Sequence, residues 1–295
     1  MRKIQILFTL LSLFTIVTYG QNKEVKITKE KLTEHIYVLK GRGGNIGLFV
    51  GEQEVFMIDD QFAPLSEKIL KAIRTISDKP LKYLVNTHWH GDHTGGNTNM
   101  QKEGAIIVSH ENVRKRMGTE QVVWGKKRPA SPKEALPVIT FSDDMRFYMD
   151  NEEIYITHVH NAHTDGDALV YFTTSNVLHV GDTYFQGKFP YIDLGSGGSI
   201  DGYIKGIEKM LLLSDDDTKI IPGHGNVTSK KELKSYLKML QGLKDNVVKA
   251  IKEGKTLEEV KSDVSITKAF KEYSGWITEE RIRETIYKSL KEAKM

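Results

Sequence analysis

The stretch "THWHGDHTGGN", residues 87–97, places three histidines and an aspartate within six consecutive positions, in a chain of 295 residues that has only ten histidines. Residues two apart in extended backbone point to the same side, so His88 and His90 can hold one ion while Asp92 and His93 face another. Imidazole and carboxylate groups at this density favour zinc. The stretch therefore predicts a metal site.

The segments before this stretch are predicted to be strands and one helix. "LKYLVNT", residues 81–87, is typical of a buried strand, so the histidine cluster follows a strand end. Residues 64–77 have apolar side chains at helical spacing. Between residues 25 and 60, apolar runs separated by glycine-containing turns predict a meander of strands, "VKIT", "HIYVL", "NIGLFV" and "EVFMIDD".

A second series of strands and helices follows the cluster. We expect helices at 111–117 and 200–213, with a loop that runs from the end of the first helix to residue 132. Strands are expected at "AIIVSH", "MRFYM", "EIYITHV", "ALVYF", "VLHVGD" and "TKIIPGHG". Strands interleaved with helices in two similar halves predict a layered α/β domain, residues 21–228, with its helices outside.

The two ends of the chain differ from this domain. Residues 229–295 have apolar positions at helical spacing, and Thr256 with Glu259 forms a capping-box pattern, which predicts a helical extension packed on the domain. A role in covering substrate is the alternative. At the other end, Arg2, Lys3 and a short apolar run predict a signal peptide over residues 1–20. We therefore expect a periplasmic or secreted protein with no membrane anchor after cleavage. A spanning anchor would need a longer run.

Charge and cysteine content narrow the function. Without residues 1–20 the chain has 40 basic and 39 acidic residues, a net charge of +1, which does not favour nucleic-acid binding. A small-molecule substrate is expected instead, and nothing in the sequence indicates an oligomeric state. Because the chain has no cysteine, it has no disulfides, and any metal must be held by nitrogen and oxygen atoms.

Three more candidate ligands occur where predicted strands run into glycine-containing loops. They are His163 in "NAHTDGD", Asp182 in "HVGDTYF" and His224 in "IPGHGN". His160 is an alternative to His163. Together with the cluster, these residues provide enough ligands for two ions.

This ordered set, HxHxDH followed by His, Gly-Asp and Gly-His, resembles the metallo-β-lactamase fold superfamily of hydrolases over about residues 45–226. The resemblance implies an α/β, four-layer αββα sandwich with its site at one edge, between two sheets. It implies two Zn²⁺ ions, an aspartate at Asp59 that braces the ligand loop, and a bridging hydroxide oriented by Asp92. The implied ligands are His88, His90 and His163 for the first ion, Asp92, His93 and His224 for the second, and Asp182 between them.

Departures from known branches bear on the substrate. The best-known β-lactamase subclass has a cysteine at the position of Asp182 and a lysine at that of Phe185, so this subclass is not favoured, although lactamase activity stays open. The "HTDGD" stretch also departs from the HTxGH stretch of glyoxalase II enzymes. Lys188 and Tyr184 are predicted to contact a substrate carboxylate or an oxyanion.

We therefore expect a zinc-dependent hydrolase in which the bridging hydroxide attacks the carbonyl of an amide or lactam, ester, lactone or thioester. Three alternatives remain: a β-lactamase proper, a persulfide dioxygenase with one Fe²⁺, and a non-catalytic metal-binding protein. Metal content and hydrolysis of chromogenic substrates distinguish them.

Overall fold

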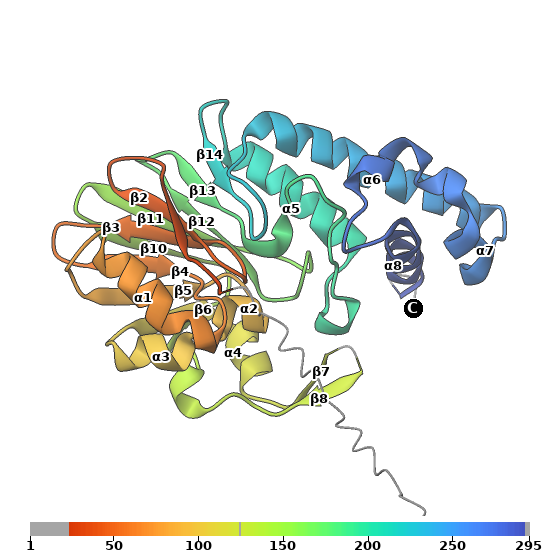
Figure 1. The fold of residues 1–295 in the computed structure, drawn as a ribbon. Helices are drawn as coiled ribbons and strands as arrows, with labels where there is room; N and C mark the ends of the chain where they lie inside the picture. Colours follow the sequence, from red (N-terminus) through yellow and green to blue (C-terminus); the bar gives the residue numbers. More distant parts are fainter. Residues whose placement is uncertain (1–23, 124, 293–295) are drawn as a thin grey trace, which may run out of the picture.

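The computed structural model describes residues 24–123 and 125–292, so the predicted signal peptide lies outside the described residues. Two β-sheets lie face to face, with helices on the outer side of each (Figure 1). This arrangement confirms the predicted four-layer αββα sandwich with helices at the C-terminus. No helix of the described residues is both long enough and apolar enough to cross a membrane.

The first sheet begins as an antiparallel meander and continues with parallel strands, as expected where a helix connects successive strands. Its strand order is β1 (Thr28–Lys31), β2 (Ile36–Lys40), β3 (Ile46–Val50), β4 (Val55–Ile58), β5 (Leu81–Asn86), β6 (Ile106–His110) and β9 (Ile139–Phe141).

The second sheet is antiparallel except for its last pair, which is parallel. Its order is β10 (Asp144–Met149), β11 (Glu152–Val159), β12 (Asp167–Phe172), β13 (Val177–His179) and β14 (Lys219–Ile221). Apolar side chains that alternate along these strands pack between the sheets against those of the first sheet, for example Phe56 against Phe172.

Helices cover the outer faces. The first sheet packs on α1 (Ser66–Arg74) and α3 (Asn97–Lys102), through a core that includes Ile69 and Met100. On the second sheet, one continuous core includes α5 (Ile200–Leu213), α6 (Lys230–Lys252) and α8 (Glu279–Glu292). The remaining α-helices are short: α2 (Gly91–Thr94), α4 (Glu111–Met117) and α7 (Leu257–Ser262).

Local sequence signals explain several boundaries. Helices α4 and α5 have the predicted bounds, and α7 begins with the predicted capping box, in which Thr256 and Glu259 bond each other's backbone N–H. The predicted loop before residue 132 instead contains a small hairpin, β7 (Gln121–Val123) and β8 (Lys126–Arg128). Its strands have three residues each and bury none of them fully, so they lack the alternation that indicates a half-buried strand, and the prediction missed them.

Candidate metal centre

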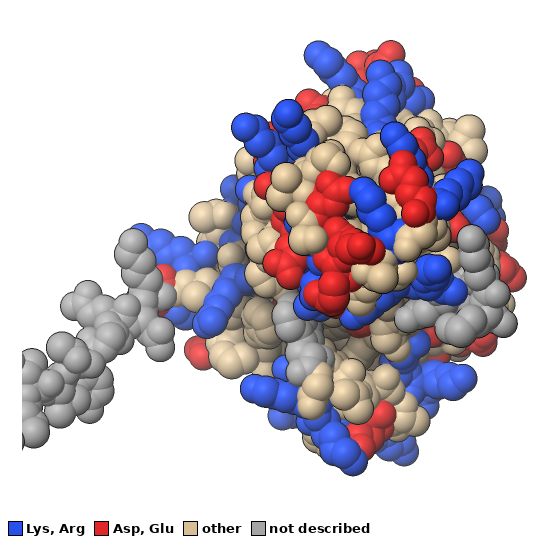
Figure 2. All heavy atoms as spheres, turned by 90° about the vertical axis from the view of Figure 1, so that its right-hand side faces the viewer, with Lys and Arg blue, Asp and Glu red and all other residues tan. Residues whose placement is uncertain are grey.

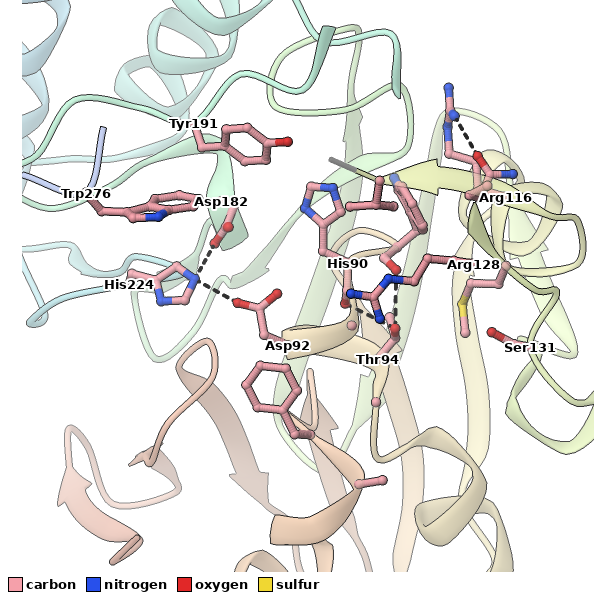
Figure 3. A pocket seen from close by; sticks show the side chains of 18 of the residues that line it. His90, Asp92, Thr94, Arg116, Arg128, Ser131, Asp182, Tyr191, His224 and Trp276 are labelled. Carbon is pink, nitrogen blue, oxygen red and sulfur yellow. Dashed lines mark hydrogen bonds and ion pairs between the residues drawn. The ribbon is translucent and has the colours of Figure 1, made fainter. Parts of the chain in front are cut away.

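The seven candidate ligands converge from four strand ends at one edge of the sandwich. His88 and His90 follow β5, and Asp92 and His93 lie in α2 directly after them. The other three lie after β11, β13 and β14, and these are His163, Asp182 and His224. Figure 3 shows His224 pointing toward Asp92 and Asp182, with His90 beside them. The structure therefore brings together residues that lie up to 136 positions apart in the sequence.

Three histidines form the first ligand group. Nδ1 of His90 lies 2.9 Å from Nε2 of His163, and the His88 ring packs edge-on against both rings. Oδ2 of Asp182 lies 3.7 Å from Nε2 of His163 and 3.9 Å from Nε2 of His88. One carboxylate oxygen therefore faces this group.

The other oxygen of Asp182 faces the second group. Oδ1 lies 3.2 Å from Nε2 of His93 and 3.5 Å from Nε2 of His224. Oδ2 of Asp92 lies 3.2 Å from the same nitrogen of His224 and 3.6 Å from that of His93. Asp182 thus stands between two ligand groups, one oxygen toward each.

The donor set fits metal ions. Within each of three groups, His88–His90–His163, His88–His93–Asp182 and Asp92–His93–His224, the ligand atoms lie within 4.8 Å of one another. Nε2 of His88, Nε2 of His93 and Oδ1 of Asp182 are buried and make no hydrogen bond. Buried polar atoms without partners are costly, and coordination of a cation would satisfy all three.

The ring nitrogens that face away from the centre are held by hydrogen bonds. Nδ1 of His93 contacts Oδ2 of Asp59 at 2.7 Å, Nε2 of His90 contacts Oδ2 of Asp193 at 3.0 Å, and Nδ1 of His163 contacts the carbonyl of Tyr191 at 2.7 Å. Such contacts fix which nitrogen remains for a metal. Asp59 occupies the bracing position predicted for it. Sequence reasoning missed Asp193, because nothing in "YIDLGSGG" indicates which residue its side chain meets.

The Asp193 contact leads to a prediction about metal affinity. Asp193→Ala removes the partner of His90 Nε2, so we expect a 10–100-fold weaker metal affinity with the fold retained. Asp193→Asn keeps an oxygen that accepts from His90 and should restore most of that affinity. Competition with a chromophoric chelator measures both variants. An alanine variant with wild-type affinity would show that this contact does not orient the ligand.

Two glycines allow the ligands to sit this close to the backbone. A Cβ at Gly44 would lie 2.1 Å from the His93 ring, and a Cβ at Gly223 would lie 1.9 Å from Oδ1 of Asp182. Both distances are far below van der Waals contact. The "GGNIG" and "PGHG" stretches are therefore needed to accommodate the centre.

The protonation of the ligands follows from burial and neighbouring charge. Burial lowers the pKa of His163 to about 4, so its ring is neutral at pH 7, as a metal ligand must be. Burial disfavours the charged form of Asp92, but His93 and His224 outweigh it and lower the pKa to about 2. Burial likewise opposes a charge on His224, yet Asp182 and Asp92 raise its pKa to about 9. The carboxylates are thus ionised and strongly attract cations.

The centre opens into a cavity of about 980 Å³, within the size range of sites for small molecules. Asp92, Asp182 and His224 line it, and so does Lys188. The prediction for Tyr184 is wrong. Its ring is 2% exposed and packs edge-on against Tyr236 in the core, because apolar neighbours cover it.

A second histidine group lies outside the metal centre. The rings of His110 and His158 stack at 3.8 Å, His160 contacts His158, and Nδ1 of His158 donates to the carbonyl of Asp167 at 2.7 Å. Burial, followed by the neighbouring His110, lowers the pKa of His158 from 6.5 to about 4. The folded chain therefore holds this ring neutral.

This neutral ring makes stability depend on pH. The unfolded chain binds a proton at His158 below about pH 6.5, whereas the folded chain binds it only near pH 4. The free energy of unfolding therefore decreases as the pH falls from about 6.5 to about 4. His158→Gln keeps a hydrogen-bond donor but does not titrate. Urea unfolding should show that from pH 7 to pH 5 the wild type loses about 2 kcal/mol more than the variant. Equal losses would mean that His158 titrates normally.

Comparison with known proteins agrees with this geometry. The family model described as the metallo-beta-lactamase superfamily matches residues 39–224. The chain belongs to the metallo-beta-lactamase superfamily.

Individual relatives are distant. A hydroxyacylglutathione hydrolase of Pelagibacter ubique is 27% identical over 158 residues, which cover 52% of this chain and 56% of that protein, so the chain spans about half of its length. A metallo-beta-lactamase type 2 of Bacteroides fragilis is 20% identical, over 74% of this chain and 89% of the relative. The structure of a metallo-beta-lactamase from Pontibacter korlensis superposes with a TM-score of 0.62 at 19% identity, covering 73% of this chain and 99% of that one. Fold and relatives are those of hydrolases of this superfamily.

Proposed function

We propose that this protein is a zinc-dependent hydrolase that cleaves an amide or lactam, ester, lactone or thioester at its carbonyl group. The observation that carries the proposal is the Asp182 carboxylate, which presents one oxygen to each of two ligand groups at the base of a substrate-sized cavity. Nitrogen and oxygen ligands at this spacing suit zinc.

Each ligand group has its own residues. His88, His90 and His163 would hold one ion and Asp92, His93 and His224 the other, with Asp182 shared. Two adjacent divalent ions, when bound, would lower the pKa of a water molecule and polarise the substrate carbonyl.

The residues around the ions then orient the reaction. Asp92 is ionised, and 28% of its side chain is exposed, so its carboxylate can accept a hydrogen bond from the attacking water and orient it. Asp59 and Asp193 hold His93 and His90 in place through their outer nitrogens. Lys188 lines the cavity with an exposed side chain, and we assign it to the oxyanion that develops at the substrate carbonyl.

The test is a hydrolysis screen on the zinc-loaded protein with chromogenic lactams, lactones, esters and thioesters. We expect turnover of at least one class, its loss on chelation and its return on adding zinc. Protein that contains its metal ions but hydrolyses none of the four classes would contradict the proposal and favour a non-catalytic metal-binding protein.

A further inference from the structure

Two segments that contribute no ligands form opposite walls of the cavity. One is the hairpin β7–β8, which supplies Gln121, Val123 and Arg128. The other lies between residues 273 and 279, just before α8, and supplies Trp276 and Ile277. In Figure 3, Trp276 lies on the side of His224, and Arg128 lies on the other side of His90. Any substrate at the metal centre therefore lies between these two walls.

Trp276 provides an apolar surface that is held in position. Its side chain is 63% exposed, and its ring meets that of Tyr191 at 5.4 Å, while Tyr191 lies 5.9 Å from the His90 ring. The segment is anchored because the amide of Phe189 donates to the carbonyl of Tyr273 at 2.7 Å and their rings stack. A large aromatic surface kept exposed beside a catalytic centre is suited to bind an apolar group.

The opposite wall carries an available positive charge. Arg116 also lines the cavity, but Asp165 binds its guanidinium through two hydrogen bonds of 2.7 Å. Arg128 makes no ion pair with any residue in the described ranges. The acidic residues of the cavity, Asp92 and Asp182, belong to the metal centre, so Arg128 is left to pair with an anion from outside.

We propose that Trp276 and Arg128 determine substrate specificity, and that the preferred substrate has an aromatic or apolar group on one side of its scissile bond and an anionic group on the other. The apolar group packs on Trp276 and the anion pairs with Arg128. This inference rests on the proposed function for its chemistry. It also depends on a part of the chain beyond residues 39–224, the range that the family model matches.

Thioesters test the inference well, because the chain has no cysteine and any thiol detected is product. S-phenylacetyl thioglycolate carries both features, S-acetyl thioglycolate lacks the ring, and the ethanethiol ester of phenylacetic acid lacks the charge. In each reaction water adds to the carbonyl carbon, the C–S bond breaks, and the acid and the thiol are released. A thiol reagent such as DTNB follows the rate.

Each variant should affect only the substrates that carry its feature. Trp276→Ala is expected to lower kcat/KM about tenfold for the two phenylacetyl esters but not for S-acetyl thioglycolate. Arg128→Gln should lower it about tenfold for the two thioglycolates but not for the uncharged ester. The matched controls are Tyr148→Ala, at an exposed aromatic residue, and Lys126→Gln, in the same strand as Arg128 and outside the cavity lining. The proposal would be overturned if either variant lowered kcat/KM equally for all three esters, or changed it for none of them.

A binding measurement separates this inference from the proposed function. 4-Oxo-5-phenylpentanoate has a methylene group in place of the thioester sulfur and cannot be hydrolysed. By isothermal titration calorimetry, both variants should bind it about tenfold more weakly than the wild type and the two controls. Wild-type affinity in either variant would overturn the specificity proposal. Wild-type protein that binds the ketone more tightly than both variants but hydrolyses no lactam, lactone, ester or thioester would contradict only the proposed chemistry.

Discussion

Asp92→Asn is expected to lower kcat/KM by about 10²–10⁴-fold while leaving the fold intact. Asparagine has nearly the same shape as aspartate, but it carries no charge to attract a cation, and it has one acceptor oxygen in place of two with which to orient water. In the structure Oδ2 of Asp92 lies 3.2 Å from Nε2 of His224 and faces the cavity. The variant therefore loses both the charge of a ligand and the group that orients the attacking water.

Steady-state kinetics at saturating zinc measure this loss, and far-UV circular dichroism checks the fold. Asp216→Asn is the control, because Asp216 is 90% exposed and pairs only loosely with Lys234. It should behave as the wild type. An Asp92→Asn variant that retains wild-type turnover would exclude Asp92 from the reaction.

Asp59→Asn is expected to lower the free energy of unfolding by about 2–3 kcal/mol and metal affinity by 10–100-fold. Asp59 is fully buried and accepts hydrogen bonds from the amide and hydroxyl of Thr87 and from Nδ1 of His93. An amide side chain has one acceptor oxygen and an NH₂ group, so at least one of these buried donors loses its partner.

The control for this prediction accounts for backbone conformation. Asp59 has a positive φ of 59°, a region that asparagine tolerates, so strain does not explain the expected loss. Asp150→Asn makes the same substitution at an exposed aspartate with φ of 53° and should leave urea unfolding unchanged. Equal stability of the two variants would show that Asp59 does not brace the ligand loop.

The sequence predicts the fold well where its patterns are local or strongly periodic. Apolar runs and apolar alternation predict most strands of both sheets, and the Thr256 and Glu259 pair marks the start of α7. The exceptions are β1, which follows the predicted "VKIT" and is wholly exposed, and the three-residue β9, which was not predicted. The hairpin β7–β8 was missed because its strands pair only with each other and bury almost nothing. Without a buried face there is no apolar alternation to recognise.

For the candidate site, the ligands are visible in the sequence because each follows a predicted strand and most lie beside glycine. Asp193 and Trp276 are not visible in this way, since their roles depend on contacts with segments distant in the sequence. Asp193 meets His90 across 103 positions, and Trp276 reaches Tyr191 from beyond α7. Tyr184 shows the opposite error, because proximity to Asp182 in sequence says nothing about which way a side chain points.

The most direct test of the account is the metal content of residues 21–295, purified without chelator or added metal and measured by inductively coupled plasma mass spectrometry. Two ligand groups that share Asp182 predict about two zinc ions per chain. Activity restored to metal-free protein should then reach its maximum at two equivalents. A single iron per chain would contradict the two-zinc hydrolase and point to oxygen chemistry, and the absence of bound metal would contradict the assignment of the centre itself.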